Sequence, residues 1–279
     1  MQNIERHRIT AAMIGLILWL SYGYAYAQFD HQHAAYAELL KKHVVVLEGG
    51  KSTQVSYLGM AQDRIRLKSY LDSVSGVAEA EFKAWSKDQQ LAFLINAYNA
   101  YMVELILTRY PNIKSVWDFG KVFNNPFRNR FFTLFGKPAS LDHIEHDLIR
   151  ADGVYNDPRI HFAVNCASVG CPALREEPFV AARLEQQLEH QTTRFLGDRS
   201  RNRYNAATRT LEVSKIFDTS PWYAGDFTRG WKEYRSRESF FANYAQQLAE
   251  TPEGQRVVRE QQAAIRHLEY DWGLNDVKK

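Results

Sequence analysis

Residues 140–175 contain most of the side chains in this sequence that could carry out chemistry. The candidates are a thiol, two imidazoles, a carboxylate and two neutral polar groups, which belong to Cys166, His146, His161, Glu145, Asn165 and Ser168. A cysteine becomes a nucleophile when its surroundings favour the thiolate and a base lies within hydrogen-bond reach. The small side chains that follow Cys166 would leave room for a substrate, which Ser168 could contact. The segment predicts a Cys–His site that attacks an amide or thioester, in which Asn99 or Asn165 orients the imidazole or donates to the oxyanion.

Two histidines are candidates for the base that would activate Cys166. His161 precedes the cysteine by five residues, and on an extended strand the two side chains would point to opposite faces. They could pair only if the chain turns between them. His146 lies on a preceding predicted helix, which can aim its side chain across the turn at Cys166. We therefore favour His146 as the base and expect His161 to be packed and hydrogen-bonded beneath the strand.

The cysteines also support a non-catalytic interpretation. Cys166 and Cys171 are the two cysteines of the sequence, and four residues separate them. In an oxidising compartment such a pair tends to form a disulfide. The chain would then be a periplasmic binding or scaffolding module whose Cys166–Cys171 bridge holds a loop. A thiol–disulfide exchange role fits less well, because the spacing differs from the C-x-x-C arrangement of redox proteins.

Residues 1–27 have the composition of a cleavable secretory signal peptide. A short positive leader precedes an apolar run at residues 9–20, and an A-x-A sequence follows just before Gln28. We therefore expect the mature chain to begin at Gln28 and to be periplasmic or secreted. The alternative is a retained membrane anchor, which requires about 20 apolar residues. We judge no later stretch long enough to cross a bilayer, so no stable membrane span is expected after cleavage.

Charge and composition limit the partners that this chain can have. The formal net charge is +3, and the basic cluster at residues 199–203 is more typical of a solvated loop than of a nucleic-acid-binding surface. The histidines at 143 and 146, together with Asp142, lack the spacing of recognised zinc motifs. We therefore expect no nucleic acid, metal or cofactor. A small molecule or a peptide is the expected ligand class.

The strongest predicted element is a helix over residues 87–110. Ser86 is a suitable N-cap, and Pro111 would end the helix. Its centre is apolar almost all round, which is typical of a buried central helix. Asn96 and Asn99 are exceptions on one face of it, and they should be hydrogen-bonded because unpaired buried polar groups are costly.

Shorter elements are predicted along the rest of the chain. Helices are expected over residues 29–47, 61–71, 141–150, 179–196 and 238–248, and strands over residues 54–58, 131–134, 159–165, 210–214 and 267–272. No internal repeat or Pro/Ser-rich linker divides the chain. The pattern predicts one α+β domain over residues 28–279, mainly helical and packed around a small β-sheet.

Four blocks of this sequence resemble a known family. The blocks are residues 85–100, 140–146, 157–172 and 211–217, followed by Trp222-Tyr223. In this order they are similar to the family known as domain of unknown function 547, over about residues 82–227. The resemblance implies no activity, because the family has no established function.

The resemblance does imply which polar positions form a site. The matching positions are Asn96 and Asn99 in an N-x-x-N pattern, Glu145 and His146 in an I-E-H triplet, and His161, Asn165, Cys166 and Cys171 in an H-F-x-x-N-C-x-x-x-x-C-P block. His143 stands where relatives carry an acid, so it is not included. The two asparagines of the helix beside this block suggest a single polar pocket. Such a pocket could contact a substrate through Asn96 and Asn99, or it could be a structural network.

Overall fold

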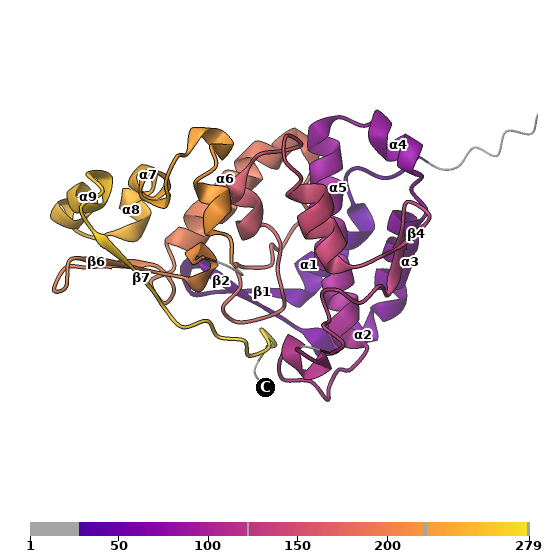
Figure 1. Ribbon diagram of the computed structural model, residues 1–279. Helices are drawn as coiled ribbons and strands as arrows, with labels where there is room; N and C mark the ends of the chain where they lie inside the picture. The colour runs from indigo at the N-terminus through magenta and orange to yellow at the C-terminus, as the bar shows by residue number, and fades with distance from the viewer. Residues whose placement is uncertain (1–27, 122, 220–221, 278–279) are drawn as a thin grey trace, which may run out of the picture.

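The structure is a computed structural model that describes residues 28–121, 123–219 and 222–277. The signal peptide predicted at residues 1–27 lies outside the described residues. The described chain has the predicted α+β fold and is mainly helical. Figure 1 shows helices α1 to α5 on one side of the molecule, α7 to α9 with β6 and β7 on the other, and α6 between them.

Helix α5 (Lys87–Leu107) is the central helix that the sequence predicts. Ser86 caps it, because its hydroxyl accepts from the Gln89 N–H while the Gln89 side chain accepts from the Ser86 N–H. The helix ends three residues before the predicted end at 110. Contrary to our expectation for the chain beyond residue 27, α5 is long and apolar enough to cross a bilayer, yet 94% of its most apolar window is buried inside the protein.

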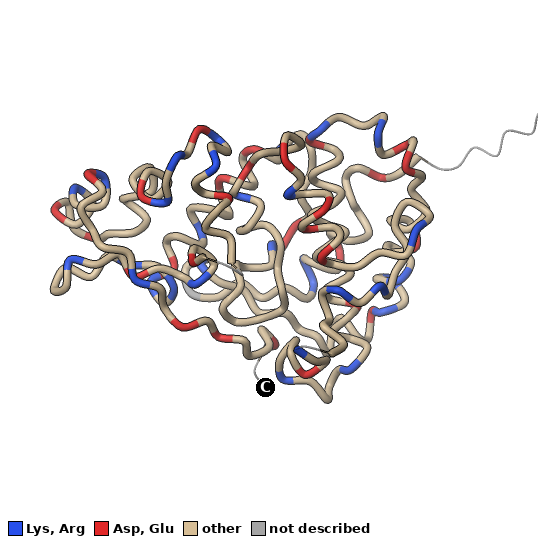
Figure 2. The backbone as a smooth tube through the Cα atoms, in the orientation of Figure 1, with Lys and Arg blue, Asp and Glu red and all other residues tan. Residues whose placement is uncertain are grey.

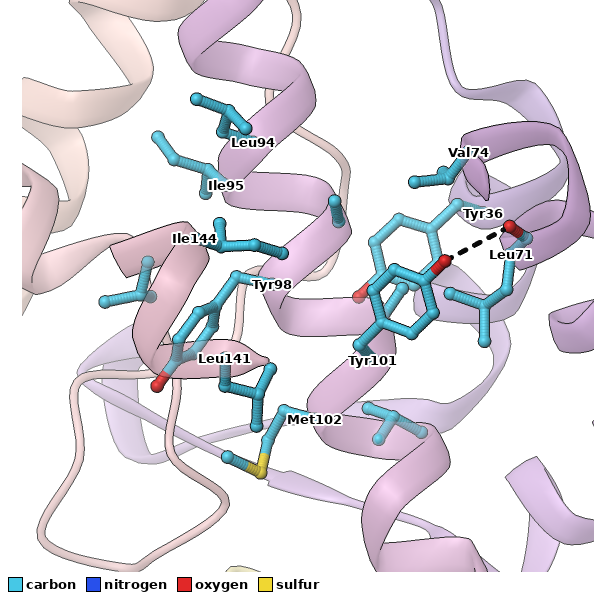
Figure 3. Packing of buried hydrophobic residues seen from close by; sticks show 14 of the residues in the cluster. Tyr36, Leu71, Val74, Leu94, Ile95, Tyr98, Tyr101, Met102, Leu141 and Ile144 are labelled. Atoms are coloured by element: carbon cyan, nitrogen blue, oxygen red, sulfur yellow. Dashed lines mark hydrogen bonds between the residues drawn. The ribbon is translucent and has the colours of Figure 1, made fainter. Parts of the chain in front are cut away.

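Short helices pack around α5 in the first half of the chain. They are α1 (Ala34–His43), α2 (Tyr57–Gln62), α3 (Arg64–Ser75) and α4 (Glu79–Ala84). Figure 3 shows Tyr98 of α5 between Leu141 and Ile144 of the segment that follows β4, while Tyr101 points to the opposite side, where its hydroxyl donates to the Leu71 carbonyl of α3. Both faces of α5 are therefore occupied, which explains why its sequence is apolar almost all round.

A second hydrophobic core lies in the other half of the molecule. Here α6 (Leu184–Leu196) packs against α8 (Ala245–Leu248), which in turn packs with α7 (Arg237–Asn243) and α9 (Pro252–Arg259). Its centre is a set of fully buried phenylalanines: Phe162, Phe195, Phe217, Phe227, Phe240 and Phe241. The chain thus has two adjoining cores.

The strands form three small sheets in the described residues. Antiparallel pairs are β1 (Val44–Leu47) with β2 (Ser52–Val55), and β3 (Phe132–Leu134) with β4 (Lys137–Ala139). The third sheet has the order β5 (Arg203–Asn205), β6 (Thr210–Val213), β7 (Ala264–His267), with β6 and β7 parallel. The predicted helix at residues 29–47 gives way to β1 after His43, where a run of β-branched residues favours a strand.

The strand predicted at residues 159–165 is wrong. This segment forms a 3₁₀ helix, η4 (Pro158–Phe162), whose first turn is capped by the Asp157 side chain and begins with proline. The next backbone groups are bound by side chains instead of a neighbouring strand. Gln191 of α6 donates to the Phe162 carbonyl at 3.0 Å, and Asn99 of α5 donates to the Ala163 carbonyl at 2.9 Å. Long-range amide contacts of this kind leave no periodic trace in the sequence.

The remaining irregular helices are short. They are η1 (Glu48–Gly50), η2 (Val116–Phe119), η3 (His143–Ile149), η5 (Ala181–Arg183), η6 (Lys215–Phe217), η7 (Ala224–Phe227) and η8 (Trp231–Glu233). Of these, η3 is a π-helix within the helix predicted at residues 141–150. Its wider turn changes which side chains share a face.

The last described segment returns along the molecule to the first half. After β7 the chain runs back beneath the structure toward the β1–β2 hairpin (Figure 1), and Asp276 forms a bridge with Val55 of β2. On the way, Ser168 bridges Leu274 and the Asn275 N–H donates to the Ala167 carbonyl. The C-terminal segment therefore lies against the turn that carries the two cysteines.

Charged side chains of both signs are interspersed along the chain (Figure 2). Exposed ion pairs contribute at most about 1 kcal/mol each to stability. The buried pairs around Asp226 and Arg159 differ, because removal of one partner leaves an uncompensated charge.

Candidate functional site

A cavity of about 230 Å³ lies where the two halves of the chain meet, and four of the eight predicted site residues line it. Its polar and sulfur-containing lining includes Glu145, His146, His161, Cys166, Cys171 and Asp142. Its apolar wall consists largely of aromatic rings from Tyr98, Trp117, Phe127, Trp222, Tyr223, Tyr270 and Trp272. Cys166 and both candidate histidines thus line one cavity.

Glu145 places a carboxylate in this aromatic surrounding. The residue is 4% exposed, and its Oε1 atom has no hydrogen-bond partner among the described residues. Burial, and then the charge of Glu145, raise the pKa of Tyr98 and of Tyr223 well above the usual value for a phenol. Both phenols therefore remain protonated beside the carboxylate. Hydrogen bonding with the Glu145 carboxylate also contributes to the raised pKa of both phenols, whereas the Oε1 atom itself has no partner in hydrogen-bond geometry among the described residues. A buried carboxylate oxygen without a donor is costly, so Oε1 is the oxygen that can accept from a ligand.

His161 is held in one orientation by a buried carboxylate. Its Nε2 atom lies 2.7 Å from Asp226 Oδ2, and its ring stacks on Tyr223 with 3.8 Å between the ring centres. Because a carboxylate only accepts hydrogen bonds, we assign the ring proton to Nε2. This leaves Nδ1 with a lone pair, and Nδ1 has no hydrogen-bond partner among the described residues. Burial lowers the pKa of His161, so the ring is a neutral base.

Asp226 also binds two arginines. Arg150 reaches its two oxygens through Nε and Nη2, at 2.6 and 3.0 Å, and Arg229 Nη2 lies 2.9 Å from Oδ1. Burial alone would raise the pKa of Asp226, but hydrogen bonds from His161 and Arg150 lower it well below the usual value for aspartate. The carboxylate is therefore ionised and positions His161.

His146, which we favoured as the base, has its ring nitrogens directed elsewhere. Arg150 Nη1 lies 2.7 Å from His146 Nδ1, so Nδ1 accepts and carries no proton. The other nitrogen, Nε2, lies 3.8 Å from Asp142 Oδ1. Within the described residues neither imidazole is hydrogen-bonded to the Cys166 sulfur. Of the two imidazoles, His161 is therefore the one whose lone-pair nitrogen has no partner among the described residues.

The two cysteines form a disulfide in the cavity wall. The Cys166 sulfur lies 3.1 Å from both the Ser168 hydroxyl and the Tyr270 hydroxyl, while the Cys171 sulfur accepts from the Cys166 N–H. Neither sulfur is a thiolate in this state. Nucleophilic attack by Cys166 would first require reduction of the bridge.

The predicted asparagines lie behind the cavity and hold its wall. Asn96 brackets Phe179, accepting from its N–H at 2.9 Å and donating to its carbonyl at 2.7 Å. Asn99 accepts from the Asn165 N–H at 2.8 Å and donates to the Ala163 carbonyl. The prediction that both α5 asparagines are hydrogen-bonded is confirmed. Neither is among the cavity-lining residues, so the geometry gives them a positioning role instead of ligand contact.

Asn165 and Ser168 are also outside the cavity lining. Asn165 donates to the Pro172 carbonyl at 2.7 Å and accepts from the Ala167 N–H at 2.9 Å. These bonds close the loop between the cysteines. Ser168, 1% exposed, donates to the Tyr270 hydroxyl at 3.0 Å. Both residues shape the disulfide loop.

Several site residues were not found from the sequence. Asp226, Arg150 and the aromatic residues Tyr98, Trp117, Tyr270 and Trp272 come from segments far apart in the chain. Tyr98, Trp222 and Tyr223 had a signal, since they stand in the resembling blocks. Among residues 28–121, 123–219 and 222–277, no group of three or more His, Cys, Asp or Glu side chains is arranged to hold a metal ion.

Comparison with known proteins adds one finding. The model of a protein family described as "Protein of unknown function, DUF547" matches residues 82–196. No curated protein and no solved structure matches the chain. The matched segment includes α5 and the site residues from Tyr98 to Pro172, whereas Trp222, Tyr223, Tyr270 and Trp272 lie outside it.

Proposed function

Through residues 82–196 this chain belongs to the DUF547 family of proteins of unknown function, and from the geometry of its cavity we propose that it is an exported protein that binds a small organic ligand. The observation that carries the proposal is the unpartnered Oε1 of Glu145 in an aromatic-walled cavity. Ligand sites commonly combine apolar walls with a few polar groups that fix orientation. In this proposal the Cys166–Cys171 disulfide is a structural part of the wall.

The cavity limits the size and chemistry of the ligand. Its volume of about 230 Å³ lies below the range of roughly 300–1,000 Å³ that holds drug-sized ligands. A small molecule, or one side chain of a peptide, is the matching size. Glu145 requires a hydrogen-bond donor, and the electron-rich faces of Trp and Tyr rings favour a cation. An aromatic or aliphatic amine meets these requirements.

Three tryptophans in the wall make binding directly measurable. Benzylammonium should change the intrinsic fluorescence of the protein saturably, because Trp117, Trp222 and Trp272 line the cavity. Glu145→Gln should weaken binding about tenfold or more, since a hydrogen bond to a charged group is worth about 1.5–3 kcal/mol. Glu38→Gln, on the exposed surface of α1, is the matched control and should bind as the wild type does. Equal affinity in the wild type and Glu145→Gln would refute the proposal.

A second candidate function is supported by the convergence of Cys166 and His161 at the cavity. It is a thiol-dependent hydrolase or acyl-transferase that works after reduction of the disulfide. The Cys166 thiol would give its proton to Nδ1 of His161, attack an amide or thioester carbonyl, and release the amine or thiol with that proton. Water or an acceptor nucleophile would then give its proton to His161 and cleave the acyl-thioester on Cys166, and the proton would return to the sulfur. Asp226 would stabilise the imidazolium that forms.

Thiol labelling separates this second function from a structural disulfide. Unreduced, unfolded protein should contain no free thiol, because both cysteines are bridged. For an enzyme, mild reductant should release Cys166, which should react with iodoacetamide faster than Cys171 and faster than an ordinary thiol of pKa about 8.5. The rate should fall in His161→Ala, with His146→Ala as the comparison. A bridge that resists mild reductant would exclude the thiol mechanism.

A further inference from the structure

A second cavity, of about 300 Å³, lies between the β1–β2 turn and α6 and is separate from the Glu145 cavity. Lys51 lines it from the turn, and His190, Thr193 and Arg194 line it from one face of α6. Glu176 adds the one carboxylate of the lining. Most of the polar groups here are hydrogen-bond donors.

Arg194 is unusual among the arginines of this chain. Six others direct the edge formed by Nε and Nη2 at a carboxylate: Arg64, Arg150, Arg159, Arg175, Arg201 and Arg256. In Arg194 both atoms of this edge are buried without any hydrogen-bond partner among the described residues. Only Nη1 is engaged, by Glu176 at 2.8 Å and Gln191 at 3.4 Å. Unpaired buried donors are costly, above all on a charged group.

The neighbouring groups make the cavity positive and rich in donors. Lys51 forms no ion pair with the side chains that the structure describes, whereas Glu176 is already paired with Arg194. His190 accepts from Arg175 Nη1 at its Nδ1, 2.7 Å away, so its proton lies on Nε2. Burial, and then the charges of Arg175 and Arg194, lower the pKa of His190. His190 is therefore a neutral donor in a positive field.

We propose that this cavity binds a carboxylate, received by the ammonium of Lys51 and, after a turn of the buried Arg194 side chain, by the Nε–Nη2 edge of Arg194. Planar carboxylates match the two parallel N–H groups of a guanidinium edge. The lining carries two cations and one carboxylate, with His190 neutral, so its net charge fits a monoanion better than a phosphate dianion. The site is independent of the ligand proposed for the Glu145 cavity.

The Nε–H signals of the arginines in a ¹H–¹⁵N correlation spectrum test this site in the intact protein. Sodium acetate should shift the Arg194 signal saturably, relative to sodium chloride at the same ionic strength. The Arg175 signal is an internal control and should not move, because Glu177 already occupies its edge. Through-bond assignment in the wild type avoids any substitution of the buried arginine.

Two variants and one competing anion make the test decisive. Lys51→Ala removes an exposed ammonium at the cavity and should weaken acetate binding about fivefold. Lys68→Ala, on the exposed face of α3, should bind acetate as the wild type does. The proposal is overturned if acetate leaves the Arg194 signal in place or if Lys51→Ala shows unchanged affinity. An inorganic phosphate titration that saturates at lower concentration than acetate would overturn the carboxylate assignment.

Discussion

Leu94→Asp is expected to abolish the folded state. Leu94 is 1% exposed on the inner helix α5, where Figure 3 shows it in the hydrophobic cluster next to Ile95. The substitution removes a buried leucine, which costs about 2–5 kcal/mol, and places a carboxylate with no partner in the core, which costs several more. A total stability of about 5–15 kcal/mol does not tolerate this loss.

Circular dichroism during thermal and urea unfolding checks the Leu94 prediction. The variant should show no cooperative transition, whereas Leu58→Asp should unfold nearly as the wild type does. Leu58 lies on α2 and is 46% exposed, so the same substitution there buries little charge. A soluble Leu94→Asp protein with a near-normal midpoint would mean that α5 is not the core helix.

Asp226→Ala is expected to produce the second largest loss of stability, after Leu94→Asp. It leaves the His161 ring and the Arg150 guanidinium without their buried acceptor, and breaking such a buried network costs about 3–5 kcal/mol. Asp152→Ala is the matched control, because Asp152 also pairs with Arg229 but is 80% exposed at its side chain. The control should change the free energy of unfolding by at most about 1 kcal/mol.

The Asp226 effect should depend on pH in a defined direction. The folded protein lowers the pKa of Asp226 below the value of about 3.9 that an unfolded chain has. The stabilisation is therefore fully present above about pH 4 and is lost as the pH falls through the lowered pKa. His161, whose pKa is also lowered, is neutral at pH 7, so its titration does not alter the stability difference between the wild type and Asp226→Ala at that pH.

Urea unfolding of the wild type and both aspartate variants from pH 8 to pH 3 measures this dependence. The difference in free energy of unfolding between the wild type and Asp226→Ala should be constant near pH 7 and should become smaller as the pH falls below about 4. Equal stabilities of Asp226→Ala and Asp152→Ala would show that the network does not support the fold.

Regular elements with local signals were predictable from this sequence. Ser86, the apolar centre of α5 and Pro111 indicate a capped, buried helix that stops at a proline, and the structure confirms it within three residues at its end. The fold class could also be predicted, because apolar periodicity distinguishes the long helices from the short strands. One element that the sequence did not predict is η4, where side chains of Asn99 and Gln191 bind the carbonyls that a strand would pair.

The site was predictable only on its polar side. Glu145, His146, His161 and Cys166 stand close together in the sequence and in the family pattern, and they line one cavity. Asp226 was missed because an isolated aspartate carries no local sign that it will orient an imidazole 65 residues away. Our choice between His146 and His161 as the base assumed that His161 lies on a strand and His146 on a regular α-helix. In the structure His161 lies on a 3₁₀ helix and His146 on a π-helix.

The C-terminal segment gives the site a temporal order of assembly. Tyr270 covers the Cys166 sulfur, and Trp272 closes one wall, yet both are synthesised roughly a hundred residues after the cysteine loop. In the exported protein that we propose, the bridge forms in the oxidising compartment and not on the ribosome. Once the C-terminal segment has docked, the Tyr270 hydroxyl shields the Cys166 sulfur, so the two thiols are most open to an oxidant before docking.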